Sequence, residues 1–238
     1  MKTKLILCLL LSGLFFSCQK EVSLENGSGN GGGGTGGGGG GGTNTGACKD
    51  CIYFPMCDGS WYTYDVLFGT TPQVITDTLR YVKDTTIDNL VFKKMLSVAQ
   101  QAHSYQNCTN GTSRSIQYNA VSGGGTTLSE IDITPLKANL PVNGTWADTI
   151  MNGAGQAVIY NYTIKEKGVS RTVNGKVFPD VIHVYFETGI DLPLIGFFIT
   201  NTSDYYYAKG VGFIESEIKD PLSGTVIQQQ FIKAWFVP

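Results

Sequence analysis

From Gly59 to the C-terminus the sequence alternates apolar and polar residues with a period of two, and this pattern constrains the fold more than any other feature. Successive side chains of a strand point to opposite faces, so such alternation is typical of β-strands with one buried face. No stretch keeps an apolar period of 3.6 residues over three turns, as an amphipathic helix would. The sequence therefore predicts an all-β domain of antiparallel strands.

Short turn signals separate the alternating segments. Pairs such as Asn110-Gly111 and Asn174-Gly175 accept the positive φ angles of tight hairpin turns, which join neighbouring antiparallel strands. The expected strands are 61–68, 74–82, 91–99, 114–121, 127–133, 145–150, 157–165, 181–187, 205–208, 212–218 and 226–236. No strand is expected between residues 99 and 114.

Two parts of the chain repeat one order of features. Gly-Ser-Trp at 59–61 matches Gly-Thr-Trp at 144–146, and seventeen residues after each Trp comes a Thr followed by an aliphatic residue. Segment 86–92 then matches segment 172–178, and both end in Phe. This order indicates a duplicated meander, although β-rich chains also reuse the same turn chemistry without duplication. Neither half has enough strands to cover its face, so one continuous curved sheet is expected.

The first eighteen residues have the order of a secretory signal peptide. Lys2 and Lys4 form a basic region, residues 5–16 are an apolar run, and Ser17 places a small residue before Cys18. The run is too short for a membrane-spanning helix, which needs about 20 apolar residues.

The passage from Leu14 to Cys18, Leu-Phe-Phe-Ser-Cys, resembles a bacterial lipobox. The resemblance implies that Cys18 is acylated as the first residue of the mature protein. Lys20 and Glu21 look like the short export signal that some Gram-negative bacteria use for surface lipoproteins. We therefore expect a palmitate-type anchor in the outer membrane, at the cell surface or the periplasmic face, with the membrane as partner.

Glycine dominates the segment from 27 to 46. Such a chain buries too little apolar surface to offset its backbone entropy, so a disordered tether is expected. As a flexible coil of about 28 residues it has a mean reach of roughly 30 Å. The expected division is a signal peptide at 1–17, a lipidated tether at 18–46 and a single all-β domain at 47–238.

The charge of the chain argues against nucleic acid as a partner. Without Lys2 and Lys4, the 17 Lys and Arg residues fall to 15 against 19 Asp and Glu, a formal charge of about −4. No basic patch is present, and binding to a phosphate backbone depends on one.

Four cysteines remain besides Cys18 and the signal-peptide cysteine: Cys48, Cys51, Cys57 and Cys108. An even number of cysteines in an exported protein normally forms disulfides, and we expect two of them. A zinc site or a redox dithiol is the alternative. The pairing stays open, although steric sense favours one short loop and one long bridge to Cys108. Such a bridge would pin segment 53–55 to the core.

Short motifs resemble a loose group of exported bacterial lipoproteins. They are Cys-x-x-Cys-x-Tyr-x-Pro at 48–55, Gly-x-Trp-x-Thr-Tyr at 59–64, the strand pair ending at Phe92, and 206–214, Tyr-Tyr-Ala-Lys-Gly-Val-Gly-Phe-Ile. The resemblance implies a wide antiparallel sheet curled into a half-barrel or barrel, similar to lipoprotein-carrier or lipocalin-like domains. The group carries an uncharacterised β-rich domain, so no activity is implied.

The sequence contains no recognisable catalytic motif. His103 is expected on an exposed loop, and His183 shares a strand face with Glu187, which is too few ligands for a metal site. Glu215 and Glu217 are expected on the solvent side of a strand. We predict no catalytic residues, no metal and no cofactor. The largest concavity should be lined by aliphatic and aromatic side chains. Neither histidine should lie within hydrogen-bond distance of a carboxylate inside it.

Two aromatic or apolar segments invite other interpretations. Residues 205–207, Tyr-Tyr-Tyr, belong to a strand buried on one side, or else present rings that stack on sugars. Residues 192–199 form a central strand or a loop packed on the core, or else an apolar lip over a lipid-binding cavity.

The tripeptides at 77–79, 84–86 and 148–150 each begin with Asp-Thr. They resemble the Asp-Thr-hydrophobic acceptor for O-linked glycan in a group of Gram-negative bacteria. Their candidate acceptors are Thr78, Thr85 and Thr149. The predicted function is non-catalytic binding or scaffolding by an exported lipoprotein. The alternatives are a glycan-binding surface module and a carrier of a lipid or other hydrophobic ligand.

Overall fold

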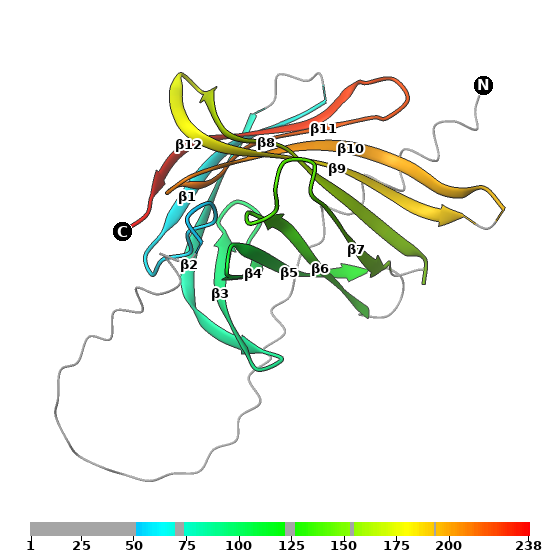
Figure 1. The fold of residues 1–238 in the computed structure, drawn as a ribbon. Coiled ribbons are helices and arrows are strands. Elements are labelled where there is room, and N and C mark those ends of the chain that lie inside the picture. Colours follow the sequence, from blue (N-terminus) through cyan, green and yellow to red (C-terminus); the bar gives the residue numbers. More distant parts are fainter. Residues whose placement is uncertain (1–50, 70–73, 122–126, 153–154, 193) are drawn as a thin grey trace, which may run out of the picture.

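The computed structural model describes residues 51–69, 74–121, 127–152, 155–192 and 194–238. Twelve strands account for about three quarters of them (Figure 1). They are β1 (Trp61–Phe68), β2 (Val74–Ile87), β3 (Leu90–Ser97), β4 (Ala102–Thr109), β5 (Thr112–Val121), β6 (Thr127–Lys137), β7 (Thr145–Met151), β8 (Ala157–Val173), β9 (Lys176–Leu192), β10 (Gly196–Ala208), β11 (Gly212–Lys219) and β12 (Val226–Phe236). The all-β prediction is confirmed.

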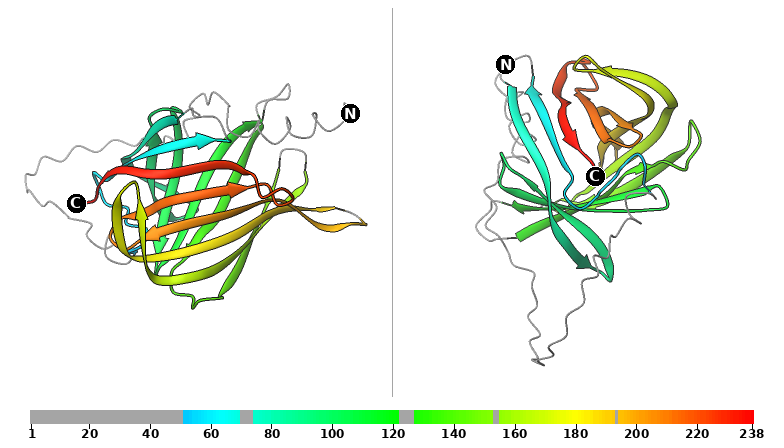
Figure 2. Two further views of the ribbon diagram at one scale, coloured as in Figure 1. Left: turned by 90° about the horizontal axis from the view of Figure 1, so that it is seen from above. Right: turned by 90° about the vertical axis from the view of Figure 1, so that its left-hand side faces the viewer.

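All twelve strands belong to one antiparallel sheet. Their order is β6-β5-β4-β3-β2-β1-β12-β11-β10-β9-β8-β7. Strands that follow each other in sequence therefore pair, except β6 and β7, and the first and last strands, β1 and β12, pair with each other. The sheet is nearly closed into a barrel. In Figure 2 strands β8–β12 lie side by side and face β2–β6 across the interior.

The sheet has one seam, between β6 and β7, which stand at the two ends of the strand order. Side chains of β7 partly bridge it, because Trp146 Nε1 donates to the carbonyl oxygen of Thr134 at 2.7 Å and the Thr134 amide donates to Asp148 Oδ2 at 2.6 Å. Lys167 Nζ, from β8, donates to the carbonyls of Ala138 and Leu140 just beyond β6. Buried backbone groups that lack a ladder partner are thereby satisfied.

The repeated features of the sequence correspond to two six-stranded meanders, β1–β6 and β7–β12, and the first strand of each contains the Trp of its repeat. The matching hairpins, β2–β3 and β8–β9, turn at Asp88-Asn89 and Asn174-Gly175, and both residues of each turn have positive φ. The pairing register is not repeated. Trp61 lies opposite Arg80, whereas Trp146 lies opposite Tyr162, three residues nearer along the chain.

Both matching hairpins bend over the outer face of the sheet. β-bulges interrupt the pairing of β2 with β3 once and that of β8 with β9 three times, and bulges bend and twist a strand pair. The bend buries the matched phenylalanines, Phe92 and Phe178. Phe92 lies beneath the Arg114 guanidinium of β5, and Phe178 packs on Trp235 of β12.

The strand predictions missed one strand and made others too short, including β2 and β10. Residues 102–109 form β4, although their polar side chains gave no apolar alternation; His103 therefore lies on a strand and not on a loop. Strands β8 and β9 each extend over 17 residues, well beyond the predicted segments, because the bent hairpin carries polar and apolar residues that pack on the outer sheet face.

Residues 192–199 are neither a central strand nor a loop packed on the core. β9 ends at Leu192 and β10 begins at Gly196, so the segment is a hairpin end in which Leu194 and Ile195 are exposed. The apolar run predicted a buried segment, but local hydrophobicity does not show whether a hairpin extends beyond the neighbouring strands of the sheet. Pro193 lies outside the described residues.

Candidate functional site

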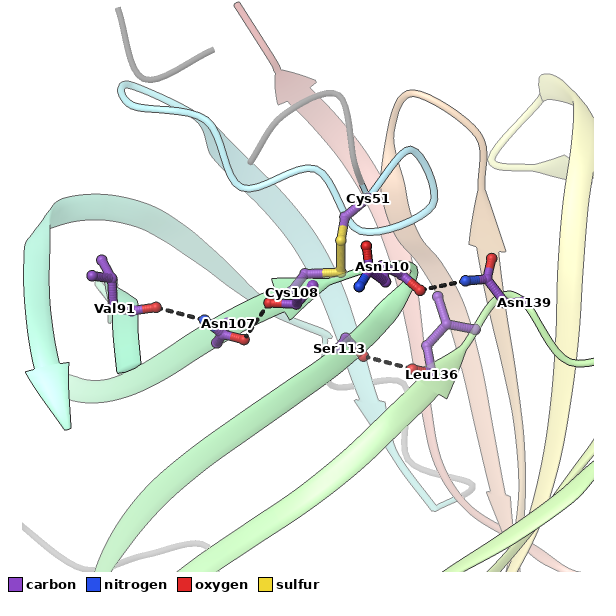
Figure 3. Close-up of a disulfide and its surroundings, with 9 residues drawn as sticks. Cys51, Val91, Asn107, Cys108, Asn110, Ser113, Leu136 and Asn139 are labelled. Atoms are coloured by element: carbon purple, nitrogen blue, oxygen red, sulfur yellow. Dashed lines mark hydrogen bonds between the residues drawn. A yellow bond between two sulfur atoms is a disulfide. The ribbon is translucent and has the colours of Figure 1, made fainter. Parts of the chain in front are cut away.

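The most constrained part of the molecule is the segment before β1, residues 51–60, which we call the plug. It closes the end of the barrel that carries the β4–β5 and β10–β11 turns. A disulfide joins Cys51 to Cys108 at the end of β4, across 57 residues of sequence (Figure 3). The amide of Gly210, in the β10–β11 turn, donates to the carbonyl of Ile52 at 2.5 Å.

Side chains of the plug then fix it to the interior. Phe54 packs against Tyr207, and Tyr62 Oη donates to the carbonyl of Pro55 at 2.5 Å. Tyr53 Oη donates to Asp180 of β9 at 2.6 Å. Burial and this hydrogen bond raise the pKa of Tyr53 to about 12, and the same bond lowers the pKa of Asp180.

The cysteine pairing includes the expected long bridge to Cys108. Cys57 is also disulfide-bonded, whereas Cys48 lies outside the described residues. Cys18 lies outside them too, so its predicted acylation stays a prediction. The bridge holds segment 53–55 against the core.

A small cavity of about 160 Å³ lies beside the disulfide. Its lining is mainly apolar and aromatic, with one amide side chain and neither histidine among the lining residues. The lining residues are Cys51, Ile52, Tyr53, Phe54, Cys108, Gly111, Leu136, Ala138 and Asn139. Drug-sized ligand pockets span about 300–1,000 Å³, so this cavity is small for a lipid or an oligosaccharide.

Aromatic rings fill the interior next to the plug. Trp146 and Tyr162 stack with centroids 4.9 Å apart and an interplanar angle of 6°, and Tyr162 also contacts Phe186. Tyr205, Phe186 and Phe213 continue the packing across β9, β10 and β11. Such ring contacts combine a large buried area with specific geometry, so they make a rigid core.

The three tyrosines at 205–207 are all packed inside the protein. Tyr205 and Tyr207 point to one side of β10 and Tyr206 to the other, and the β-bulge at this point adds its extra residue, Ile214, to β11. Tyr207 lies in the interior with its hydroxyl donating to the carbonyl of Pro135, and Tyr206 lies on the outer face beneath the bent β8–β9 hairpin. The alternative of outward rings that stack on sugars is therefore wrong for this segment.

His183 belongs to an ion-pair network on the outer face. Its ring stacks on Tyr206, and Arg171 covers the same ring with its guanidinium carbon 3.3 Å from the centroid. His183 Nε2 lies 2.7 Å from Asp204 Oδ1. Burial disfavours the Asp204 carboxylate, but the bond to His183 and the charge of Lys219 outweigh it and lower the pKa of Asp204.

The glutamates predicted near this region have structural partners. Glu187 accepts a hydrogen bond from Tyr185, its neighbour on the strand face, and does not converge with His183. Glu215 is not simply on the solvent side: the bent hairpin covers it, and Arg171 binds it through two hydrogen bonds of 2.5 and 2.8 Å. Glu217 pairs with Lys219. Among the described residues no group of three or more His, Cys, Asp or Glu is arranged to hold a metal ion.

The three candidate glycan acceptors differ in accessibility. Thr149 is exposed on β7, a strand that is unpaired along its seam edge. Thr78 is half-buried within β2 and its hydroxyl contacts Thr63 Oγ1 at 3.0 Å, while Thr85 is half-buried near the bent hairpin. A glycosyltransferase needs a free hydroxyl, so Thr149 is the best acceptor of the three.

We expect Thr149→Ala to remove O-linked glycan from the exported protein and Thr78→Ala to leave it in place. Intact-protein mass spectrometry of material from the native bacterium measures both. A glycan that persists in Thr149→Ala and disappears in Thr78→Ala would contradict the accessibility argument.

The fold and its plugged, ring-filled interior define the class of protein: a nearly closed antiparallel barrel of twelve strands whose described core holds aromatic side chains. Within the described residues no helix is long and apolar enough to cross a membrane. No family model and no curated protein matches the sequence.

Two solved structures are similar to this chain. One is a crystal structure of a "putative lipoprotein" from Parabacteroides distasonis, with 15% sequence identity, coverage of 79% of this chain and 100% of that one, and a TM-score of 0.48. The other is a "putative exported protein with YmcC-like fold" from Bacteroides fragilis, with 8% identity, the same coverages and a TM-score of 0.47. Neither name states a ligand or an activity.

Proposed function

We propose that this protein is an exported, acyl-anchored protein without catalytic activity, which works by presenting a rigid surface for binding or scaffolding. The filled interior carries the proposal. Rings from β7–β11, together with Phe54 of the plug, pack the space behind the plug, so the working surface of the domain is its outside. The anchor rests on the signal-peptide order and the lipobox-like passage that ends in Cys18.

The pairing of charged side chains supports a non-catalytic role. Arg114 binds Asp132, Arg171 binds Glu215, and Lys93, which is buried, lies 2.5 Å from Asp58 and 2.8 Å from Asp84. An acid, base or nucleophile has to face a substrate with a proton-transfer atom available. These groups are engaged in ion pairs that hold strands and hairpins together.

We expect Cys18→Ser to move the protein from the membrane fraction to the soluble fraction, because two or more acyl chains give almost permanent membrane attachment. Immunoblots of separated membrane and soluble fractions measure the change. Cys8→Ser, within the signal peptide, is the matched control and should leave the protein in membranes. Retention of Cys18→Ser in membranes after signal-peptide cleavage would show that the anchor lies elsewhere.

The proposal also implies that the barrel does not carry a bound ligand, and this can be tested separately. Native mass spectrometry of the protein purified from its own membranes in mild detergent should give the mass of the acylated chain, with any O-linked glycan, and no further bound molecule. A lipid or oligosaccharide bound at one molecule per chain would favour the carrier or the glycan-binding alternative instead.

A further inference from the structure

The β9–β10 hairpin extends beyond the rest of the sheet. β8 pairs with β9 as far as Ile190, and β11 pairs with β10 from Thr202 inward. Beyond these points β9 and β10 pair only with each other: Asp191 and Leu192 of β9 have no partner in β8, and residues 196–201 of β10 have none in β11. Figure 1 shows this hairpin, in yellow and orange, projecting past the adjacent strands.

The end of this hairpin, residues 191–192 and 194–199, which we call the tip, exposes apolar side chains on both of its faces. Leu194 is fully exposed and Ile195 is 73% exposed. Phe197 and Phe198 are both partly exposed, and as successive strand residues they point to opposite faces of the ribbon. A protein interface would cover one face of the ribbon, whereas entry into an apolar phase covers the apolar side chains of both faces together.

The backbone of the tip is built to hold this arrangement. Phe197 lies across Gly189, where an added Cβ would come within 2.6 Å of the Phe197 ring, so only glycine leaves room for it. The Ile195 amide donates to the Leu192 carbonyl and closes the turn, and Leu194 has a φ of +76°. A leucine in the left-handed region is unfavourable, and such positions are retained mainly where function requires them.

A single charged side chain near the tip limits the depth to which the tip can enter an apolar phase. Between Gly189 and Asn201 the sequence has one ionisable side chain, Asp191, which is exposed and lies opposite Phe197. Thr200 and Asn201 follow where the ribbon rejoins the sheet. Insertion to about 5–10 Å, as for interfacial membrane segments, places Leu194 and Ile195 among the acyl chains and the phenylalanines at the level of the headgroups.

We infer that the tip inserts into the leaflet of the membrane that carries the acyl anchor, and so holds the barrel against the lipid surface. This inference rests on the proposed anchor at Cys18. The 32 residues between Cys18 and Cys51 can span about 105–115 Å when extended. β9, which runs from the region of the plug to the tip, has 17 residues and is about 56 Å long. The chain is therefore long enough for the far end of the barrel to return to the membrane.

The test uses the full acylated protein in vesicles of phosphatidylethanolamine and phosphatidylglycerol. Ile195→Cys is labelled with the fluorophore NBD, which shifts to the blue in apolar surroundings; Cys51, Cys57 and Cys108 are held in disulfides. We expect a blue-shifted emission that lipids with a doxyl group on the acyl chain quench. Val177→Cys, a similarly exposed position on β9 next to the β8–β9 turn, is the control and should give the emission of NBD in water.

A second substitution in the labelled Ile195→Cys protein separates insertion from mere proximity. Leu194→Asp should abolish the blue shift and the quenching, whereas Leu222→Asp, on the exposed β11–β12 turn, should preserve both. The two leucines are both exposed, so neither change should affect folding.

Three results would overturn the inference. If the protein floats with the vesicles in a density gradient but the label at position 195 keeps the emission of NBD in water, the tip stays outside the bilayer. If the protein does not float with the vesicles, the anchor at Cys18 fails as well. If the label shifts to the blue without vesicles as the protein concentration rises, a second copy of the chain covers the tip.

Discussion

Replacement of Trp146 by Ala is expected to destabilise the protein by about 3–5 kcal/mol, the usual range for a buried Trp or Phe truncated in a core. Trp146 is 8% exposed and stacks on Tyr162, so the change leaves a cavity between β7 and β8. It also removes the donor that binds the carbonyl of Thr134 across the seam. Urea unfolding measures the loss of stability, and amide exchange at Thr134 measures the opening of the seam.

The internal repeat supplies the matched control. Trp61 holds the same place in the first meander but is 38% exposed, and we expect Trp61→Ala to cost less than about 1 kcal/mol, as for most surface substitutions. Trp146→Phe keeps a ring in the stack and removes the N–H donor, so its cost should lie between the two. Equal effects of the two alanine substitutions would mean that the seam contributes little to stability.

Removal of the bridge between Cys51 and Cys108 is expected to cost about 4 kcal/mol. In the chain-entropy model, closing a loop of 57 residues restricts the unfolded chain by about that amount. The loss should exceed that of Tyr53→Phe, which keeps the bridge and removes only the hydrogen bond to Asp180, worth about 1–3 kcal/mol.

Thermal unfolding of Cys51→Ser/Cys108→Ser under non-reducing conditions tests this expectation. Proteolysis adds a local readout, because the released plug should be cut first while the strands stay protected. A double variant as stable as the parent protein would show that the hydrogen bond from Gly210 to Ile52 and the packing of Phe54 hold the plug without the disulfide.

The repeat in the sequence indicated the architecture but not its details. The matched turns form corresponding hairpins, because Asp88-Asn89 and Asn174-Gly175 impose the same local geometry. The spacing from Trp to Thr is equal in the two repeats, but the pairing of the Trp with the next strand differs. Strand register depends on the loops and on which faces become buried. For the same reason Trp146 is buried and Trp61 is half-exposed.

The sequence by itself determined the class of the fold, most strand positions and the turns, because alternation and turn chemistry are local properties of the chain. It also favoured a long bridge to Cys108, which the structure contains.

Only the tertiary structure decided which surfaces are buried. The bent hairpins cover outer-face residues such as Glu215 and Tyr206, and polar β4 is a strand because its neighbours β3 and β5 supply its hydrogen bonds. Leu194 and Ile195, in the apolar run at 192–199, are exposed because the adjacent strands end before them. Burial depends on partners distant in the sequence, and no local pattern records where those partners end.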